Sequence, residues 1–103
     1  MRQDILDKIR SIKEKYEPEG FVILGVFGSY ARGDEKSQSD IDILYRINDI
    51  ALTKYPGWAF FSLYERVKSD LQTILNTKVD LADSDALGPV GKKYILPETI
   101  YVN

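Results

Sequence analysis

The residues of this sequence best suited to chemistry are two aspartates, Asp40 and Asp42, in an apolar segment. They alternate with Ile41 and Ile43, so in a strand both carboxylates point to one face. Two carboxylates about 4 Å apart repel each other by on the order of 4 kcal/mol at the dielectric near a protein surface. A divalent cation would remove this repulsion, and oxygen ligands without histidine or cysteine favour Mg²⁺ or Mn²⁺ over zinc. The alternative is that both aspartates face solvent on an edge strand.

A third aspartate, Asp80, lies in the apolar segment 77–82, opposite the hydrophobic side of the predicted strand. If this strand lies beside that of the first two aspartates, the three carboxylates can converge, which suits two-metal phosphoryl chemistry. Asp83 and Asp85 are competing candidates, but they lie at the end of the strand, where Ser84 or Asp83 can cap the next helix. We favour Asp80 because it alone lies within the alternating pattern.

Gly28 and Ser29 follow the apolar run 21–27 and stand where a strand ends and a short helix begins. Free backbone N–H groups and the helix dipole make such a point suitable for an anion. Gly28 would let a phosphate approach the backbone closely, and the Ser29 hydroxyl could donate to a phosphate oxygen. The alternative is a purely structural turn in which Ser29 caps the helix.

The elements that must position these residues follow from hydrophobic periodicity. It predicts helices over 2–16, 29–33 and 58–75, and strands over 21–27, 40–47, 77–82 and 99–102. Residues 48–57 are expected to be a connection, and 84–96 show little pattern. The interspersed helices and strands indicate an α/β or α+β fold, and 103 residues suffice for one domain over 1–103 but not for two.

The helix predicted over 58–75 carries one apolar stripe that we assign to the core, formed by Phe60, Leu63, Tyr64, Val67, Leu71, Ile74 and Leu75. Trp58 and Phe61 fall off this stripe. They are candidates for partner docking, because Trp and Phe are enriched at interfaces. The alternative is that they cover the sheet edge or pack under the preceding loop.

The composition excludes several classes of function. The chain has no histidine and no cysteine, which excludes Ser-His-Asp catalysis, disulfides, and thiolate or imidazole zinc sites. The net charge of −2 gives no basic surface, so we expect no direct nucleic-acid binding. The N-terminal segment is too charged for a signal peptide, and the longest apolar run is too short to span a membrane. We therefore expect a cytoplasmic protein.

The run GSYARGDEKSQSDID resembles the signature of the polymerase-β-like nucleotidyltransferase superfamily, which is Gly-Ser, ten residues, then Asp-x-Asp. The residues Ala31-Arg32-Gly33 and Ser39-Asp40 are similar to its small branch, the minimal nucleotidyltransferases (MNT proteins). The resemblance is close over 21–46 and extends to 77–82 through the third aspartate. It implies the polymerase-β-like fold, a mixed sheet of three to four strands flanked by helices.

The same resemblance implies Mg²⁺-dependent transfer of a nucleoside monophosphate, with ATP as the expected substrate, to an acceptor hydroxyl. Gly28 and Ser29 would hold the triphosphate. Asp40 and Asp42 would ligate two metal ions, and Asp80 would ligate the catalytic one and help to deprotonate the acceptor.

A sixth candidate site residue is Arg32, which would either contact phosphate or pin the loop by pairing with Asp34 or Glu35. The phosphate contact would make Arg32 part of the nucleotide-binding site. These two interpretations are equally compatible with the sequence.

MNT proteins of this size are often encoded beside HEPN proteins, which are all-helical RNases. The resemblance therefore implies an antitoxin that neutralises a HEPN toxin by adenylylating a tyrosine. The alternatives are a small-molecule nucleotidyltransferase with a partner subunit and a non-catalytic binding module. A second copy of the chain, in a homo-oligomer, could also hold the acceptor. A chain of this length has no room for an acceptor domain, which disfavours the small-molecule interpretation. The intact Gly-Ser and aspartate residues disfavour a degenerate site.

Overall fold

The computed structural model describes residues 1–103 and contains a four-stranded sheet. Its strands are β1 (Phe21–Phe27), β2 (Ile41–Ile47), β3 (Val79–Asp83) and β4 (Ile100–Tyr101), in the order β3-β2-β1-β4. β1 is antiparallel to both β2 and β4, whereas β2 and β3 are parallel. The sheet is therefore mixed, as predicted, and all four predicted strands form with small shifts at their ends.

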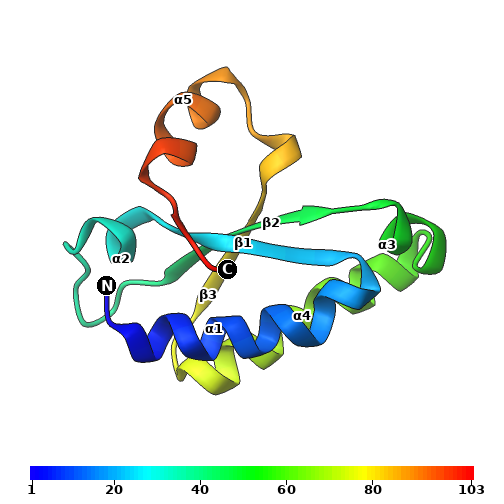
Figure 1. Ribbon diagram of the computed structural model, residues 1–103, viewed down its shortest axis with the longest axis horizontal. Coiled ribbons are helices and arrows are strands. Elements are labelled where there is room, and N and C mark those ends of the chain that lie inside the picture. The colour runs from blue at the N-terminus through cyan, green and yellow to red at the C-terminus, as the bar shows by residue number, and fades with distance from the viewer.

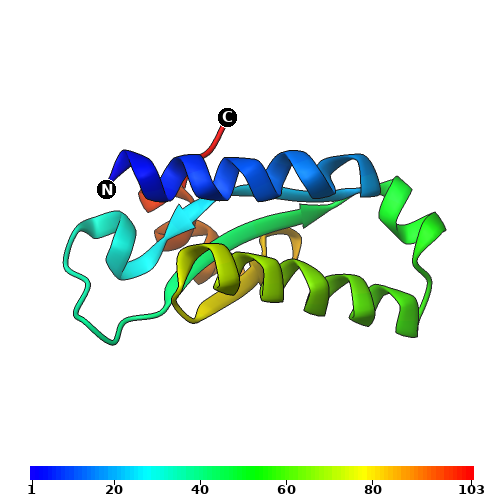
Figure 2. The same ribbon diagram turned by 90° about the horizontal axis from the view of Figure 1, so that it is seen from below.

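Helices cover the sheet on both sides. They are α1 (Gln3–Tyr16), α2 (Gly28–Arg32), α3 (Asp49–Lys54), α4 (Trp58–Leu75) and α5 (Pro89–Glu98), with short 3-10 turns η1 (Glu17–Glu19) and η2 (Ser84–Ala86). Figures 1 and 2 show that α1 and α4 run across one face of the sheet, while α5 lies on the opposite side. None of these helices combines the length and apolar character that a membrane crossing would need.

The hydrophobic core lies between the sheet and the pair α1 and α4. The helices bury Ile5, Ile9, Ile12, Tyr16, Leu63, Val67 and Leu71 in it. The other predicted stripe residues of α4, Phe60, Tyr64, Ile74 and Leu75, are partly buried against the same cluster. The predicted core face of α4 is thus confirmed. Trp58 and Phe61 lie off it, as expected, and remain 85% and 55% exposed.

Two helices lie where none was predicted. α3 occupies the expected connection 48–57 and buries only Ala51, so it has no apolar stripe to detect. Its start has a local signal, because the Asn48 side chain accepts a hydrogen bond from the N–H of Ile50 at 3.0 Å. α5 buries no residue and contains Pro97, so its sequence lacks helical periodicity.

The C-terminal strand β4 reaches β1 only because β1 has a glycine at the contact. β4 pairs with Gly25 and Val26. A Cβ on Gly25 would lie 2.2 Å from the carbonyl oxygen of Ile100 and 2.8 Å from the Cα of Tyr101. This close backbone approach brings the end of α5 back to the strand that leads into α2.

Candidate active site

The predicted aspartates lie on the sheet face opposite the α1–α4 core. Asp42 on β2 and Asp80 on β3 are direct partners in the parallel register, so their side chains stand next to each other on the same face. Asp40 comes just before β2, two residues from Asp42. The alternating residues Ile41 and Ile43 are 1% and 0% exposed in the core. The structure therefore brings Asp42 and Asp80 together and places Asp40 at the start of the same strand.

Gly28 lies directly against Asp42. It has a left-handed backbone with φ of 75°, and a Cβ at this position would be 2.1 Å from Asp42 Oδ2. The antiparallel register places Phe27 opposite Asp42, so the end of β1 and the start of α2 meet the acidic strand at this point. The two halves of the Gly-Ser and Asp-x-Asp motif are thus in contact, and only glycine fits without displacing the carboxylate.

The acidic neighbourhood changes the protonation of Asp42. Partial burial of the carboxyl group is the main cause that raises the pKa of Asp42 above its usual value of 3.8. The negative charges of Asp80 and Asp40 raise this pKa further, whereas the positive charge of Arg32 lowers it. The site therefore concentrates negative charge, which a cation would stabilise.

Ser29 lies within α2 and does not cap it, so the predicted serine cap is wrong. The helix begins one residue earlier, at Gly28, so the N-cap position falls on Phe27. The side chain of Phe27 has no polar atom that could accept a hydrogen bond. The predicted end of the helix is confirmed, because Gly33 adopts a left-handed backbone with φ of 79° there.

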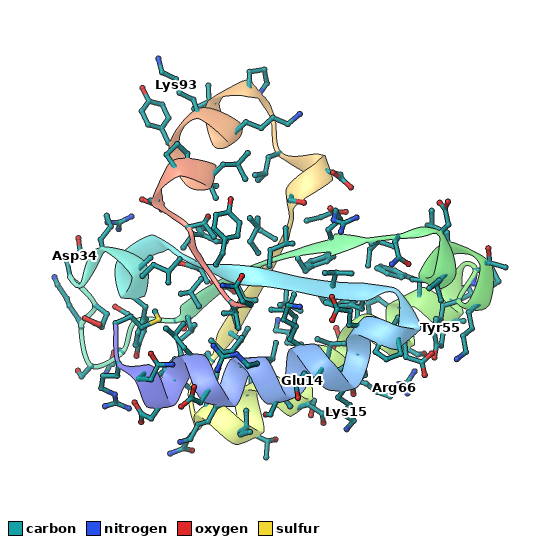
Figure 3. The ribbon with its side chains drawn as sticks, viewed as in Figure 1. Glu14, Lys15, Asp34, Tyr55, Arg66 and Lys93 are labelled. Carbon is teal, nitrogen blue, oxygen red and sulfur yellow. The ribbon has the colours of Figure 1, made fainter.

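Arg32 pairs with two carboxylates. Its Nε lies 3.2 Å from Asp34 Oδ2, and its Nη1 lies 3.2 Å from Glu98 Oε2. Asp34 lies on the loop that follows α2 (Figure 3). Of the two loop partners that the sequence offered, Asp34 is the one that pairs with Arg32, and Glu98 is a further partner that was not predicted. The hydrogen bond to Asp34, and to a smaller extent that to Glu98, raises the pKa of Arg32 above its usual value.

Glu98 is a residue of this site that the sequence analysis missed. Its carboxylate also accepts a hydrogen bond from the Gly28 N–H, with an N to Oε1 distance of 2.9 Å. Glu98 is the last residue of α5, far from the motif in sequence and on a helix without apolar periodicity. No local pattern marks it, because only the pairing of β4 with β1 brings it to Gly28.

Of the two competing aspartates, Asp83 at the end of β3 has a separate structural role, and Asp85 lies in the η2 turn. Asp83 accepts a hydrogen bond from the N–H of Asp85 at 2.9 Å and so caps the η2 turn. This is the capping role that the sequence predicted for Asp83. Asp80 is the only aspartate of β3 in register with Asp42.

The three carboxylates do not form a ready-made metal cluster. No group of three or more acidic side chains is arranged to hold one ion. Asp42 and Asp80 are adjacent, Asp40 lies just before the start of β2, and the negative charges of Asp80 and Asp40 both act on Asp42. The expectation that these three carboxylates converge on a metal ion stays a prediction. The donor chemistry still fits a hard cation, since all ligands are oxygen atoms and like charges crowd Asp42.

Comparisons with known proteins show which family this sequence and fold are similar to. Residues 7–102 match the family described as Polymerase beta, Nucleotidyltransferase. The protein adenylyltransferase MntA of Thermococcus cleftensis is 38% identical over 103 residues, which cover 94% of this chain and 95% of that protein. A solved structure provisionally described as a minimal nucleotidyltransferase aligns with a TM-score of 0.70 and 26% identity, over 91% of this chain and 88% of its own. A toxin–antitoxin crystal structure with AMP-PNP aligns with a TM-score of 0.66 and 22% identity, over 95% of this chain and 72% of its own.

The chain belongs to the polymerase beta nucleotidyltransferase family. The resemblance to minimal nucleotidyltransferases and the predicted fold are both confirmed. The chain is a nucleotidyltransferase, and its relatives carry the name protein adenylyltransferase.

Proposed function

We propose that this protein transfers AMP from ATP to a hydroxyl group, in a Mg²⁺-dependent reaction whose acceptor is a tyrosine of a HEPN-type toxin. The observation that carries the proposal is the contact of Gly28 with Asp42, beside which Asp80 stands in register. This contact joins the Gly28 turn, where we expect the triphosphate, to β2, which carries Asp42. The named relative MntA and the AMP-PNP in the toxin–antitoxin structure support ATP and a toxin partner.

The proposed roles follow from position. Gly28, Ser29 and Arg32 would hold the triphosphate, and Asp40 and Asp42 would hold two metal ions. Mg²⁺ would neutralise charge on the triphosphate and the leaving pyrophosphate when bound. The acceptor oxygen forms a bond to the α-phosphorus while the bond from that phosphorus to the β-phosphate oxygen breaks.

Asp80 is the best placed group to take the proton of the acceptor hydroxyl. It is exposed on β3, an edge strand of the sheet, so an acceptor can reach it from solvent. With no histidine in the chain, a carboxylate is the natural base. The acceptor enters with its hydroxyl proton and leaves as the phosphodiester, and pyrophosphate is released.

Partner docking would use the exposed aromatic pair of α4. The Trp58 and Phe61 rings stack edge to face, with centroids 6.3 Å apart. Such a pair on one exposed turn of a helix resembles the aromatic anchors of protein interfaces. We propose that the toxin binds at this pair. We also propose that the chain forms a single domain and acts in the cytoplasm, as the sequence led us to expect.

A transfer assay tests this function. The protein is incubated with Mg²⁺, ATP labelled on the α-phosphate and the product of its neighbouring gene, and the partner is weighed by mass spectrometry. We expect the partner to gain one or more AMP units, and Asp42→Asn to abolish the gain while the complex still forms. Asp83→Asn is the matched control, because this aspartate caps a turn and pairs in register with Tyr45 instead of Asp42.

Two outcomes would contradict the proposal in different ways. Full activity of Asp42→Asn would contradict the role of the acidic strand. A stable complex without AMP transfer by the wild-type protein would favour a binding module that silences its partner by contact.

A further inference from the structure

The feature that carries a further inference is the Glu98 carboxylate, which bridges both ends of α2. It accepts from the Gly28 N–H at 2.9 Å and from Arg32 Nη1 at 3.2 Å through its other oxygen. Its side chain is 26% exposed, and that of Arg32 is 50% exposed. A single side chain from the C-terminal helix therefore holds the first and the last residue of the helix that follows β1.

The short helix α2 needs such a contact to stay in place. It has only five residues and no side-chain cap of its own. An isolated helix of this length is not stable in water, because one or two hydrogen bonds do not offset the cost of nucleation. Its position therefore depends on tertiary contacts, and Glu98 supplies charge-assisted bonds at both of its ends.

The location of Glu98 is unfavourable for a purely stabilising ion pair. Its negative charge acts on Asp42, which already feels two other carboxylates. An ion pair on an exposed surface contributes little to stability, and the repulsion between Glu98 and Asp42 opposes that contribution. What the contact does achieve is to tie Gly28 and Arg32 to one carboxylate.

We propose that Glu98 is a positioning residue for nucleotidyl transfer, which aligns the Gly28 turn and the Arg32 guanidinium for the triphosphate. This inference rests on the proposed function and extends it to the C-terminal segment. Glu98 reaches the site only when β4 pairs with β1, so a correctly closed C-terminus is a condition for a correctly formed nucleotide site. Glu98 itself does not touch the reacting atoms.

The test compares Glu98→Ala, Glu98→Gln and two controls in steady-state AMP transfer with ATP as the varied substrate. Glu98→Ala should raise KM for ATP roughly tenfold or more, as expected for loss of charge-assisted bonds. Glu98→Gln keeps an oxygen that accepts from Gly28 and should recover part of this loss. Asp34→Asn removes only the outer partner of Arg32 and should have a smaller effect, while the distant Glu14→Gln should match the wild type.

A change in KM that Glu98→Gln partly rescues is a result that a merely structural role would not produce. Unchanged KM in both Glu98 variants would overturn the inference. A lower KM would also overturn it, because that result would mean that Glu98 competes with the triphosphate for Gly28 and Arg32.

A second measurement separates this inference from the proposed function. In the ¹⁵N-labelled protein without nucleotide, Glu98→Ala should shift the Gly28 amide resonance and speed its hydrogen exchange, whereas Asp34→Asn should not. An inactive wild-type protein would contradict the proposed function. An unchanged Gly28 amide in Glu98→Ala would contradict the positioning role, whether or not the protein is active.

Discussion

The contact between Gly28 and Asp42 makes a prediction that stability measurements can test without any substrate. Replacement of Gly28 by alanine puts a Cβ 2.1 Å from Asp42 Oδ2, 3.0 Å from its Cγ and 3.3 Å from its Cβ. The backbone at this residue is also left-handed, with φ of 75°. The variant thus combines a strained backbone with a steric clash.

The two effects have different sizes. The left-handed backbone costs an alanine about 1–2 kcal/mol relative to glycine. Overpacking against a fixed neighbour costs about 1–3 kcal/mol. Rotation of the Asp42 carboxylate about its Cβ–Cγ bond relieves the Oδ2 contact but leaves the 3.0 Å contact with Cγ. We therefore expect Gly28→Ala to lower the free energy of unfolding by about 2–5 kcal/mol.

Gly33→Ala is the matched control, because Gly33 has a similar φ of 79° but no atom within 4 Å of the added Cβ. This variant should show the backbone cost alone, about 1–2 kcal/mol. In an Asp42→Ala background, Gly28→Ala should cost about as little as Gly33→Ala. The double-mutant cycle should therefore give a coupling of about 1–3 kcal/mol between Gly28 and Asp42.

Urea unfolding at pH 7, followed by far-UV circular dichroism, measures these free energies. Fluorescence of Trp58 is a poor probe, since this side chain is already 85% exposed in the folded protein. Equal destabilisation by Gly28→Ala and Gly33→Ala, or no coupling to Asp42→Ala, would refute the proposed contact.

Two further predictions concern the backbone contact of β4 and an ion pair between α1 and α4. Gly25→Ala should lower the free energy of unfolding by about 1–3 kcal/mol, because the new Cβ would meet the β4 backbone. Gly91→Ala in α5, whose new Cβ meets only ordinary contacts, should be neutral or stabilising by up to about 1 kcal/mol. Urea unfolding of both variants measures these changes. Hydrogen bonds from Lys15 and then Tyr16, at 2.8 Å and 2.6 Å, lower the pKa of Asp70 below 3.8. The resulting stabilisation, below about 1 kcal/mol for a partly exposed pair, is present above the unfolded-state pKa and is lost as the pH falls through the lower folded-state pKa. Asp70→Asn should therefore unfold more easily at pH 7 but lose less stability than the wild type between pH 5 and about pH 2, as unfolding curves across this range will show; parallel curves for the two proteins would contradict the assignment.

Local pattern was enough for the elements that bury a regular face. The stripe of α4 and the apolar run of β1 repeat with the helix and strand periods, so their positions follow from sequence alone. The alternation around Asp42 likewise showed which carboxylates share a face. α3 and α5 bury almost nothing, and without a buried face their sequences carry no periodic signal.

What the sequence determined by itself was which side chains the candidate site offers, because residue types and their spacing within one strand and one turn are local properties. It placed Gly28 at the turn and two aspartates on one face of the next strand. Strand order was decided only by the tertiary structure, since pairing between distant segments depends on packing of the whole chain. That packing set Asp80 beside Asp42 and brought Glu98 to Gly28, although each pair is far apart in sequence.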